Sequence, residues 1–564
     1  LHRRRHSFPT RRSSDLLPSF RDPDASLAAD SPVLVVDETR GERVPVFAEP
    51  DANAKDPAHP ALVIRPLARL RPGARYAVGV RTRVRGADGA PVEPSPGFRA
   101  LRDGGRYRHP RFAALAADAD AMFAALAAAG APRAALALAW ELVTASDGAL
   151  RADLTAMRAA ALPMIGDRGA GLGPSPFALT AQPAGADAYR RFTGTFKSPD
   201  FLTDGEADGS RLRRDAAGAP IARGLRDARI AVLVPACVTS QPLPRPTIVF
   251  GHGLFGSGAD YLTDSFVSRL ANERCFVVVA GDFIGLTSRQ LTAATTAVTD
   301  LNLGATITEK LGQSVIDFIA LESITRGPLA AAPELAYQGA PVIDPAATFY
   351  VGGSLGGIMG NVIMAYDPNL TRGVLAVPGG AWSLLLERSL AWGVLKLAVQ
   401  SAYPERATYP LNVALFGMAF EPFDPITTAA HVIRDPLFGQ PAKSILLWYS
   451  LGDCLVTNLS TELIIREMGL PMLGPSVRAP WRLPPVTGER PSGAVVFDDH
   501  PAPLPPDTNE PPAQDNGTHA GINRKPAALR MVERFLLPPD PAAGNGCRLA
   551  GAPAPCDCAT GACD

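Results

Sequence analysis

A serine flanked by glycines is the strongest chemical signal in the chain. Ser354 lies in the pattern G-x-S-x-G, from Gly352 to Gly356, between an apolar run that ends at Val351 and an apolar segment with helical spacing. A strand–turn–helix with glycines around the serine is tight enough to expose the hydroxyl above a sheet. The pattern predicts that Ser354 is a nucleophile, and the alternative is a glycine-rich turn with a structural serine.

A second glycine-rich turn lies upstream of that serine. The loop 251–256, of sequence GHGLFG, follows the apolar run from Thr247 to Phe250. In hydrolases with such a serine turn, two backbone N–H groups stabilise the developing oxyanion. One belongs to a loop of this kind and the other to the residue after the nucleophile. We expect the donors to be the backbone amides of Leu254 and Leu355, with His252 orienting the loop and not acting as the base. The alternative is an ordinary turn at a strand end.

A serine nucleophile needs a histidine to take its proton and a carboxylate to orient that histidine. The expected chain order is serine, then acid, then histidine. Asp453 ends the apolar run 444–452, and His519 lies in a polar loop before the last amphipathic segment. The sequence therefore predicts a catalytic triad of Ser354, Asp453 and His519.

Other acids and histidines fit these roles less well. Asp424 and His431 fall in a segment that interrupts the strand–helix alternation, and His431 also precedes the acid. His500 follows a strand immediately, which is early for the loop that carries the base. Asp282 ends a strand near the predicted site, and we expect a turn-forming role for it ahead of a place in the pocket wall.

The elements that must position these residues alternate between strand and helix. Strands are predicted at 247–253, 275–282, 348–354, 373–380, 444–453 and 493–499, and helices at 307–324, 355–366 and 524–536. This alternation is typical of βαβ units and a mainly parallel sheet, so the fold class is α/β.

An apolar insertion from about 381 to 441 breaks this alternation and is expected to form a cap over the sheet edge. Its helical part, Trp382 to Gln400, offers large apolar side chains for an acyl pocket: Trp382, Leu384, Leu385, Leu386, Leu390 and Trp392. A buried cap helix would have the same pattern. We expect Phe255 and Trp382 to contact the substrate.

From about Thr247 to Leu537 the chain resembles an α/β-hydrolase. GHGLFG resembles the oxyanion loop of bacterial true lipases, and GGSLGG resembles a lipase or esterase elbow. Together with the stretch from Ala139 to Asp147 and with NGTHAGI, these motifs resemble large secreted or lipoprotein hydrolases of Gram-negative bacteria. Gly353 stands before Ser354 where many lipases have histidine. The substrate of any particular lipase therefore cannot be assigned to this chain. The resemblance implies a mostly parallel sheet flanked by helices, with a helical cap.

Five segments are predicted along the chain. Residues 1–16 have no apolar period and are expected to be a non-native, adapter-derived segment. Period-2 patterning in the next segment resembles a bacterial Ig-like β-sandwich, an all-β domain. The remaining boundaries are 17–108 for that sandwich, 109–173 for a helical connecting region, 174–540 for the catalytic domain and 541–564 for a cysteine-rich tail.

Composition limits the class of protein and its partners. The chain has 564 residues with 46% hydrophobic and 20% charged, which is enough apolar material for a large core. Lys+Arg and Asp+Glu both number 55, and a net charge of zero argues against a nucleic-acid partner. No apolar run is long enough to span a membrane. The expected partner is a small-molecule or lipid ester, and the oligomeric state stays open.

Cysteine usage bears on the compartment. The tail holds four cysteines that predict two disulfides in an oxidising environment, with a zinc site as the weaker rival: Cys547, Cys556, Cys558 and Cys563. The other three lie in apolar stretches and are expected to be small buried hydrophobes: Cys237, Cys275 and Cys454. We expect a secreted, outer-envelope or periplasmic location, peripheral association with the envelope, and a signal peptide missing from this sequence.

These observations favour a secreted serine esterase or lipase that cleaves carboxylic esters through an acyl-enzyme. The expected mechanism needs no metal and no organic cofactor. A secreted serine peptidase of the same fold is the first alternative, because a triad and an oxyanion hole serve amides equally. A non-catalytic surface or adhesion protein with a degenerate hydrolase fold is the second alternative.

Overall fold

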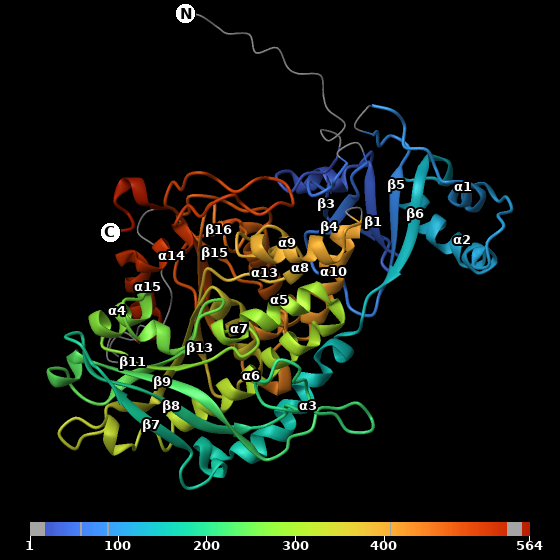
Figure 1. Cartoon of the computed structure of the whole chain (residues 1–564). Helices are drawn as coiled ribbons and strands as arrows, with labels where there is room; N and C mark the ends of the chain where they lie inside the picture. Colours follow the sequence, from blue (N-terminus) through green and yellow to red (C-terminus); the bar gives the residue numbers. More distant parts are fainter. Residues whose placement is uncertain (1–16, 57–58, 87–88, 406–407, 538–554) are drawn as a thin grey trace, which may run out of the picture. The chain divides into compact units, whose positions relative to one another are not determined.

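The computed structural model describes residues 17–56, 59–86, 89–405, 408–537 and 555–564 (Figure 1). The predicted adapter segment 1–16 and Cys547 lie outside the described residues. The chain divides into two compact units. The first comprises Leu1–Ala149, Glu405–Leu411 and Asp507–Glu510, and the second comprises Leu150–Pro404, Asn412–Pro506 and Pro511–Asp564.

The first unit is built on a four-stranded antiparallel sheet in the order β2-β1-β5-β6. A core that includes Leu34, Phe98 and Phe123 joins one face of the sheet to two helices, and a core that includes Val35 and Val46 joins the other face to a hairpin. The elements are β1 (Val33–Asp37), β2 (Glu42–Arg43), the hairpin β3 (Val46–Pro50) and β4 (Leu62–Pro66), β5 (Arg75–Arg81), α1 (Pro96–Asp103), α2 (Phe112–Ala128) and β6 (Leu136–Val143).

The predicted Ig-like sandwich is not confirmed, because helices and not a second sheet cover one face. The predicted division at residue 108 also differs from the structure. Strand β6 lies in the segment expected to be a helical connection, yet it pairs with β5 and completes the first sheet. The helix α3 (Asp147–Ile165) then leads into the second unit.

A twelve-stranded sheet organises the second unit, in the order β16-β15-β17-β14-β13-β12-β10-β11-β9-β8-β7 with β18 beside β17. The pairs from β11 across to β16 are parallel, and β7, β8 and β9 continue the sheet as antiparallel strands. The strands are β7 (Phe177–Gln182), β8 (Ala188–Pro199), β9 (Leu225–Pro235), β10 (Arg245–Gly251), β11 (Val277–Gly281), β12 (Ile343–Gly353), β13 (Arg372–Ala376), β14 (Ser444–Ser450), β15 (Met472–Leu473), β16 (Pro485–Val486), β17 (Gly493–Asp498) and β18 (Cys556–Asp557).

Helices cover both faces of this sheet because alternate strand residues point to opposite sides. Val351 and Trp448 share one core with α4 and α15, and on the other side Tyr350 contacts α7 and Tyr449 bonds to α13. The helices are α4 (Phe266–Arg274), α5 (Leu291–Thr299), α6 (Ala305–Thr325), α7 (Leu355–Tyr366), α13 (Asn458–Met468), α14 (Thr518–Gly521) and α15 (Pro526–Leu536). Among the described residues, no helix combines the length and the hydropathy needed to cross a membrane.

The insertion between β13 and β14 is helical, as the sequence predicts for the cap. The predicted helix from Trp382 to Gln400 is divided in two, with a break around Ser389 that the apolar pattern did not reveal. The insertion contains α8 (Trp382–Glu387), α9 (Trp392–Ala402), α10 (Tyr409–Phe420), α11 (Pro425–Thr428) and α12 (Ala430–Ile433).

The cysteines pair differently from the prediction. Cys237 and Cys275 form a disulfide, so the expectation that both are reduced core residues is wrong. The antiparallel pairing of β9 with β11 brings their flanking segments together, and a separation of 38 residues hides this from the sequence. Within the described part of the tail, Cys558 pairs with Cys563, while Cys556 is buried without a disulfide.

Candidate active site

Ser354 occupies the sharp turn between β12 and α7. Its backbone has φ 57° and ψ −119°, a region that side-chain-bearing residues rarely adopt. The turn is held by two backbone hydrogen bonds: the Ser354 N–H donates to Ala376 O (2.9 Å), and the Ser354 carbonyl accepts from Ile358 N–H (2.9 Å). In the described structure the Ser354 hydroxyl has no protein hydrogen-bond partner and lines a cavity, so it is available to a ligand.

Two glycines of the turn are required by close backbone approach. A Cβ on Gly352 would lie 2.3 Å from the carbonyl oxygen of Gly356, and a Cβ on Gly356 would lie 2.0 Å from the carbonyl oxygen of Gly251. Only glycine fits such contacts. The second contact also brings the end of β10, where the predicted oxyanion loop begins, against the start of α7.

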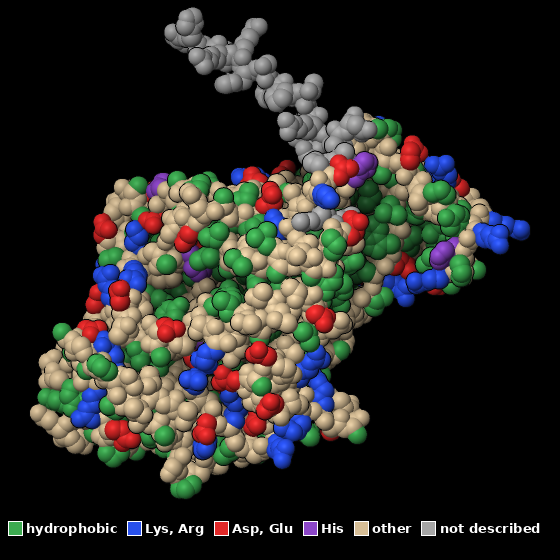
Figure 2. Space-filling view, in the orientation of Figure 1, with side chains coloured by type: hydrophobic (Ala, Val, Ile, Leu, Met, Phe, Trp, Pro, Cys, Tyr) green, Lys and Arg blue, Asp and Glu red, His purple; other side chains and the backbone are tan. Residues whose placement is uncertain are grey.

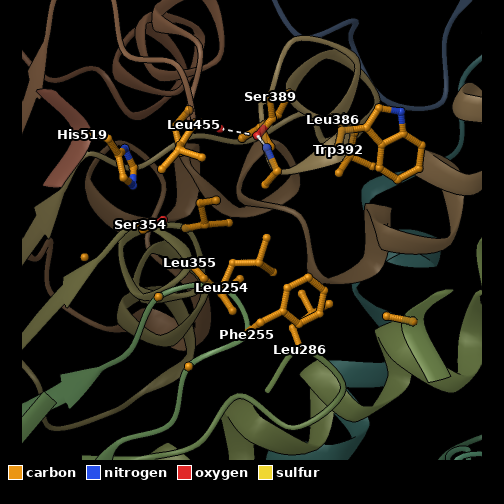
Figure 3. A pocket seen from close by; sticks show the side chains of 18 of the residues that line it. Leu254, Phe255, Leu286, Ser354, Leu355, Leu386, Ser389, Trp392, Leu455 and His519 are labelled. Atoms are coloured by element: carbon orange, nitrogen blue, oxygen red, sulfur yellow. Dashed lines mark hydrogen bonds between the residues drawn. The ribbon is translucent and has the colours of Figure 1, made fainter. Parts of the chain in front are cut away.

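The structure brings Asp453 and His519 together. His519 Nδ1 lies 2.7 Å from Asp453 Oδ2, and the other carboxylate oxygen accepts the backbone N–H groups of Leu455 and Val456 at 2.8 and 2.9 Å. Both side chains are buried. Because an ionised carboxylate only accepts hydrogen bonds, Nδ1 carries the proton and Nε2 is left to accept one. Figure 3 shows His519 and Ser354 on the same side of the cavity.

Two asparagines with no predicted role, Asn516 and Asn523, hold the segment that carries His519. Asn516 Nδ2 donates to Gly452 O (2.8 Å), which ties the histidine loop to the turn that carries the acid. Asn523 Nδ2 donates to His519 O (3.0 Å), and its Oδ1 accepts the indole N–H of Trp448 (2.8 Å). Polar residues on both sides of a predicted catalytic histidine were the available signal for these contacts.

Leu254 and Leu355, the predicted oxyanion donors, lie at the cavity beside Ser354. Both residues line the cavity with Ser354, and Figure 3 shows their side chains close to it. No hydrogen bond to another described residue occupies either N–H group. Leu355 is also the first residue of α7, so its N–H is one of the unpaired donors of a helix start.

His252 holds the oxyanion loop and does not face the cavity. Its Nε2 accepts the backbone N–H of Phe283 (2.8 Å), so Nδ1 bears the proton and donates to Gly253 O (2.7 Å). Complete burial lowers the pKa of His252 and keeps the ring neutral. The ring therefore fixes the loop that carries Leu254.

The rival residues have other partners, and none of them is among the described residues that line the cavity. Asp424 accepts backbone N–H groups within the cap, and His431 bonds to a backbone carbonyl. His500 is exposed and pairs with Asp557 (2.7 Å). Asp282 accepts the backbone N–H of Gly258 and pairs with Arg289, so it joins separate segments and does not form a local turn as expected.

The cavity beside Ser354 has a volume of about 820 Å³ and a mainly apolar wall. Phe255 and Trp382, the two predicted substrate contacts, both line it, whereas Leu384 and Leu390 do not. Trp382 stacks on Phe420 with ring centres 4.5 Å apart. Much of the apolar wall comes from the oxyanion loop, the loop after β11, α5 and the cap: Leu254, Phe255, Leu286, Leu291, Ala294, Val298, Trp382, Leu385, Leu386, Trp392, Leu395, Phe416 and Phe420.

Charges of both signs are interspersed over the face of the molecule drawn in Figure 2. Figure 2 shows acidic and basic side chains alternating across the face in view. This mixed distribution accompanies the equal totals of acidic and basic residues in the sequence.

No protein-family model matches the chain, and no curated protein sequence matches it. Solved structures that it resembles include acetyl xylan esterase 1 from Thermoanaerobacterium sp., with TM-score 0.34 and 14% identity over 60% of this chain and 84% of that one. A thermostable esterase from Pseudomonas putida gives TM-score 0.28 and 12% identity over 69% and 88%. An acylaminoacyl peptidase from Pyrococcus horikoshii gives 0.29 and 13% over 57% and 37%.

At such TM-scores the fold is established by the chain's own topology. The central strands are parallel, the Ser354 turn follows β12 near the middle of the sheet, and Asp453 and His519 follow β14 and β17. This arrangement, with a helical insertion before β14, is a mainly parallel α/β sheet covered by helices on both faces. The predicted α/β fold class is confirmed at that level.

Proposed function

We propose that this protein is a serine hydrolase that cleaves carboxylic esters through an acyl-enzyme. One observation carries the proposal: the Asp453–His519 pair and the free hydroxyl of Ser354 lie at one apolar cavity. The unused amides of Leu254 and Leu355 in the same wall support the assignment of an oxyanion hole.

Acylation begins when Ser354 Oγ attacks the carbonyl carbon of the ester and its proton passes to His519 Nε2. The carbonyl π electrons move to oxygen, and the two amides stabilise that oxyanion. As the tetrahedral intermediate collapses, the bond to the alcohol oxygen breaks and the departing oxygen takes the proton from His519. Asp453 keeps Nδ1 protonated and stabilises the imidazolium between these steps.

Deacylation repeats the sequence with water as the nucleophile. Water loses a proton to His519 Nε2 and bonds to the acyl carbon, and the second tetrahedral intermediate returns its electrons to form the acid. The Ser354 oxygen departs and recovers its proton from His519. The mainly apolar wall suits an apolar acyl group, so we propose a small-molecule or lipid ester with a medium or long acyl chain as substrate.

We also propose an extracytoplasmic location, either secreted, periplasmic or at the outer envelope. Two disulfides in the described structure, Cys237–Cys275 and Cys558–Cys563, support an oxidising compartment. Fractionation of cells that make the protein checks this, and recovery in the cytoplasm alone would refute it.

Hydrolysis of p-nitrophenyl esters from acetate to palmitate tests the proposed activity. We expect Ser354→Ala and His519→Ala each to lower kcat by about 10⁴-fold or more, because the triad acts as one unit. His500→Ala is the matched control: this histidine is exposed and does not line the cavity, so the variant keeps wild-type turnover.

Three results would overturn the proposal. Turnover retained in Ser354→Ala would show that Ser354 is not the nucleophile. A wild-type protein that is silent on every ester but cleaves peptide amides would be a peptidase. Failure of a fluorophosphonate to label Ser354 would point instead to the non-catalytic adhesion protein.

A further inference from the structure

The hydroxyl of Tyr261 is a polar group at the cavity that the triad and the two amides leave without a role. Tyr261 belongs to a 3-10 turn, Ala259–Leu262, that follows the oxyanion loop. Its oxygen accepts the backbone N–H of Gly253 at 3.1 Å. In the described part of the chain, no acceptor takes the phenol's own proton. The tyrosine therefore brings an unused donor to the cavity wall.

This hydroxyl lies next to the nucleophile and to one predicted oxyanion donor. Both groups lie close to Gly253. A Cβ built on Gly253 would be 2.5 Å from the Tyr261 oxygen and 3.8 Å from Ser354 Cβ. Gly253 directly precedes Leu254, whose amide is one of the two predicted donors. Tyr261, Leu254 and Ser354 line the same cavity.

The phenol is fixed in place and stays protonated. Its ring packs against Phe250 with centroids 5.2 Å apart, and its backbone carbonyl accepts the Ser265 hydroxyl at 2.6 Å. Burial raises the pKa of Tyr261, which keeps the proton on through moderately alkaline pH. Because an N–H group cannot accept a hydrogen bond, this proton must point away from Gly253.

We propose that Tyr261 is a third hydrogen-bond donor to the oxyanion that forms at Ser354, beside the amides of Leu254 and Leu355. The inference rests on the proposed esterase function. A fixed donor gains strength as the substrate oxygen changes from a carbonyl to an alkoxide, so it stabilises the transition state more than the bound ester. Tyr261 would then be a catalytic residue that acts on kcat.

The first test compares Tyr261→Phe with wild type on p-nitrophenyl esters. We expect kcat to fall about 100-fold with KM nearly unchanged, the loss typical of one oxyanion donor. Tyr189→Phe is the matched control, because Tyr189 lies on β8 outside the cavity lining and its variant keeps wild-type kcat. A Tyr261→Phe kcat within about twofold of that control would overturn the inference.

A second test separates donation to substrate from support of Gly253. A fluorinated tyrosine at position 261, whose phenol ionises near neutral pH, still accepts the Gly253 N–H as a phenolate but cannot donate. We expect its kcat to fall as pH rises through that lowered pKa, while wild type shows no such fall there. An unchanged profile would mean that the hydroxyl only supports the loop and would overturn the inference.

A third test varies the alcohol part of the ester, to distinguish donation to the carbonyl oxygen from donation to the leaving oxygen. A donor to the oxyanion acts on the acyl carbonyl, so Tyr261→Phe should lose equal factors on p-nitrophenyl and ethyl esters of one acid. A loss confined to the ethyl ester would place the phenol at the leaving oxygen and overturn the inference. Ser354→Ala is assayed in parallel: its inactivity upholds the proposed function whichever way Tyr261 behaves, and its full activity would refute that function itself.

Discussion

Ser354 combines a strained backbone with an unpartnered hydroxyl, and the two properties have one cause. A φ of 57° at a residue with a side chain costs on the order of 1–3 kcal/mol and persists only where its surroundings enforce it. Here the bond to Ala376 and the bare backbone of Gly352 and Gly356 enforce it. A relaxed backbone at Ser354 would point the hydroxyl in another direction, so the strain keeps this side chain at the cavity.

The contacts of Asp453 predict the effect of removing its charge. In Asp453→Asn the side-chain oxygen must stay with the N–H groups of Leu455 and Val456, because both need an acceptor. The NH₂ group then faces His519 Nδ1, which has to accept, and the proton moves to Nε2. With this wrong tautomer we expect kcat to fall about 10⁴-fold while the fold is retained.

Ester turnover and a thermal melt of Asp453→Asn check this, with Asp435→Asn as the control. Asp435 carries an exposed carboxylate beside His431, away from the cavity, so its variant should retain wild-type kcat. If Asp453→Asn kept more than about a tenth of wild-type kcat, the orientation of His519 would not depend on this carboxylate.

At the scale of elements, local determinants made the turn at Ser354 largely predictable from the sequence. The turn at Ser354 needs only an apolar strand, glycines and an apolar helix, all adjacent in the chain, and the structure has α7 at the predicted bounds, Leu355–Tyr366. The prediction failed where partners are distant. The pairing of β6 with β5 and the Cys237–Cys275 disulfide depend on strand neighbours that no local pattern encodes.

The same reasoning explains why Tyr261 was missed. Its contact with Gly253 arises from the path of the loop between them, and that path depends on how the Tyr261 ring packs on Phe250. A tyrosine in a turn has no sequence pattern of its own. The contact between Asp453 and His519, by contrast, was predictable from chain order because each residue follows a recognisable strand.

The apolar side of the cavity predicts how acyl-chain preference can be shifted. Ala294 on α5 lines the cavity and is 4% exposed, so Ala294→Phe would fill part of it. We expect activity on the acetate ester to persist. Esters with longer acyl chains should lose about 0.8 kcal/mol of binding free energy, or fourfold in kcat/KM, for each methylene that no longer fits in the cavity. The p-nitrophenyl series measures this shift in the optimum.

The control for Ala294→Phe is Thr296→Phe on the same helix. Thr296 is exposed and does not line the cavity, so a phenylalanine there adds the same side chain outside the wall. Its chain-length profile should match wild type. If both variants shifted the optimum alike, the change would come from α5 as a whole and the acyl chain would not lie against Ala294.

At the scale of the whole second unit, two polar clusters lie at opposite ends of the parallel strands. Ser354, Asp453 and His519 follow the carboxyl ends of parallel strands, as ligand sites in such sheets do. The opposite edge holds a buried acidic cluster near the ends of α6 and α7, where Glu322 Oε2 accepts the Asn369 amide at 2.9 Å. Asp367 lies in the same cluster with one carboxylate oxygen unbonded to any described residue.

This cluster makes stability depend on pH independently of catalysis. Burial, with the nearby Asp367 carboxyl, raises the pKa of Glu322 to about 8. An unfolded glutamate loses its proton near pH 4.3, so between about pH 4.3 and 8 the folded state binds more protons than the unfolded state. Stability therefore falls as pH rises through that window, by up to about 1.4 kcal/mol per pH unit from this group.

Glu322→Gln tests that dependence by keeping the shape and removing the titration. We expect the unfolding free energy of the variant to decline less than that of wild type from pH 5 to 9. The variant should therefore be more stable than wild type by the largest margin at the alkaline end of this range. Chemical denaturation across that range measures it, with Glu334→Gln on an exposed turn as the control. Parallel curves for wild type and Glu322→Gln would show that Glu322 is ionised throughout. Ester turnover at pH 7 should be equal in all three proteins, because the cluster lies at the edge of the sheet opposite to the nucleophile.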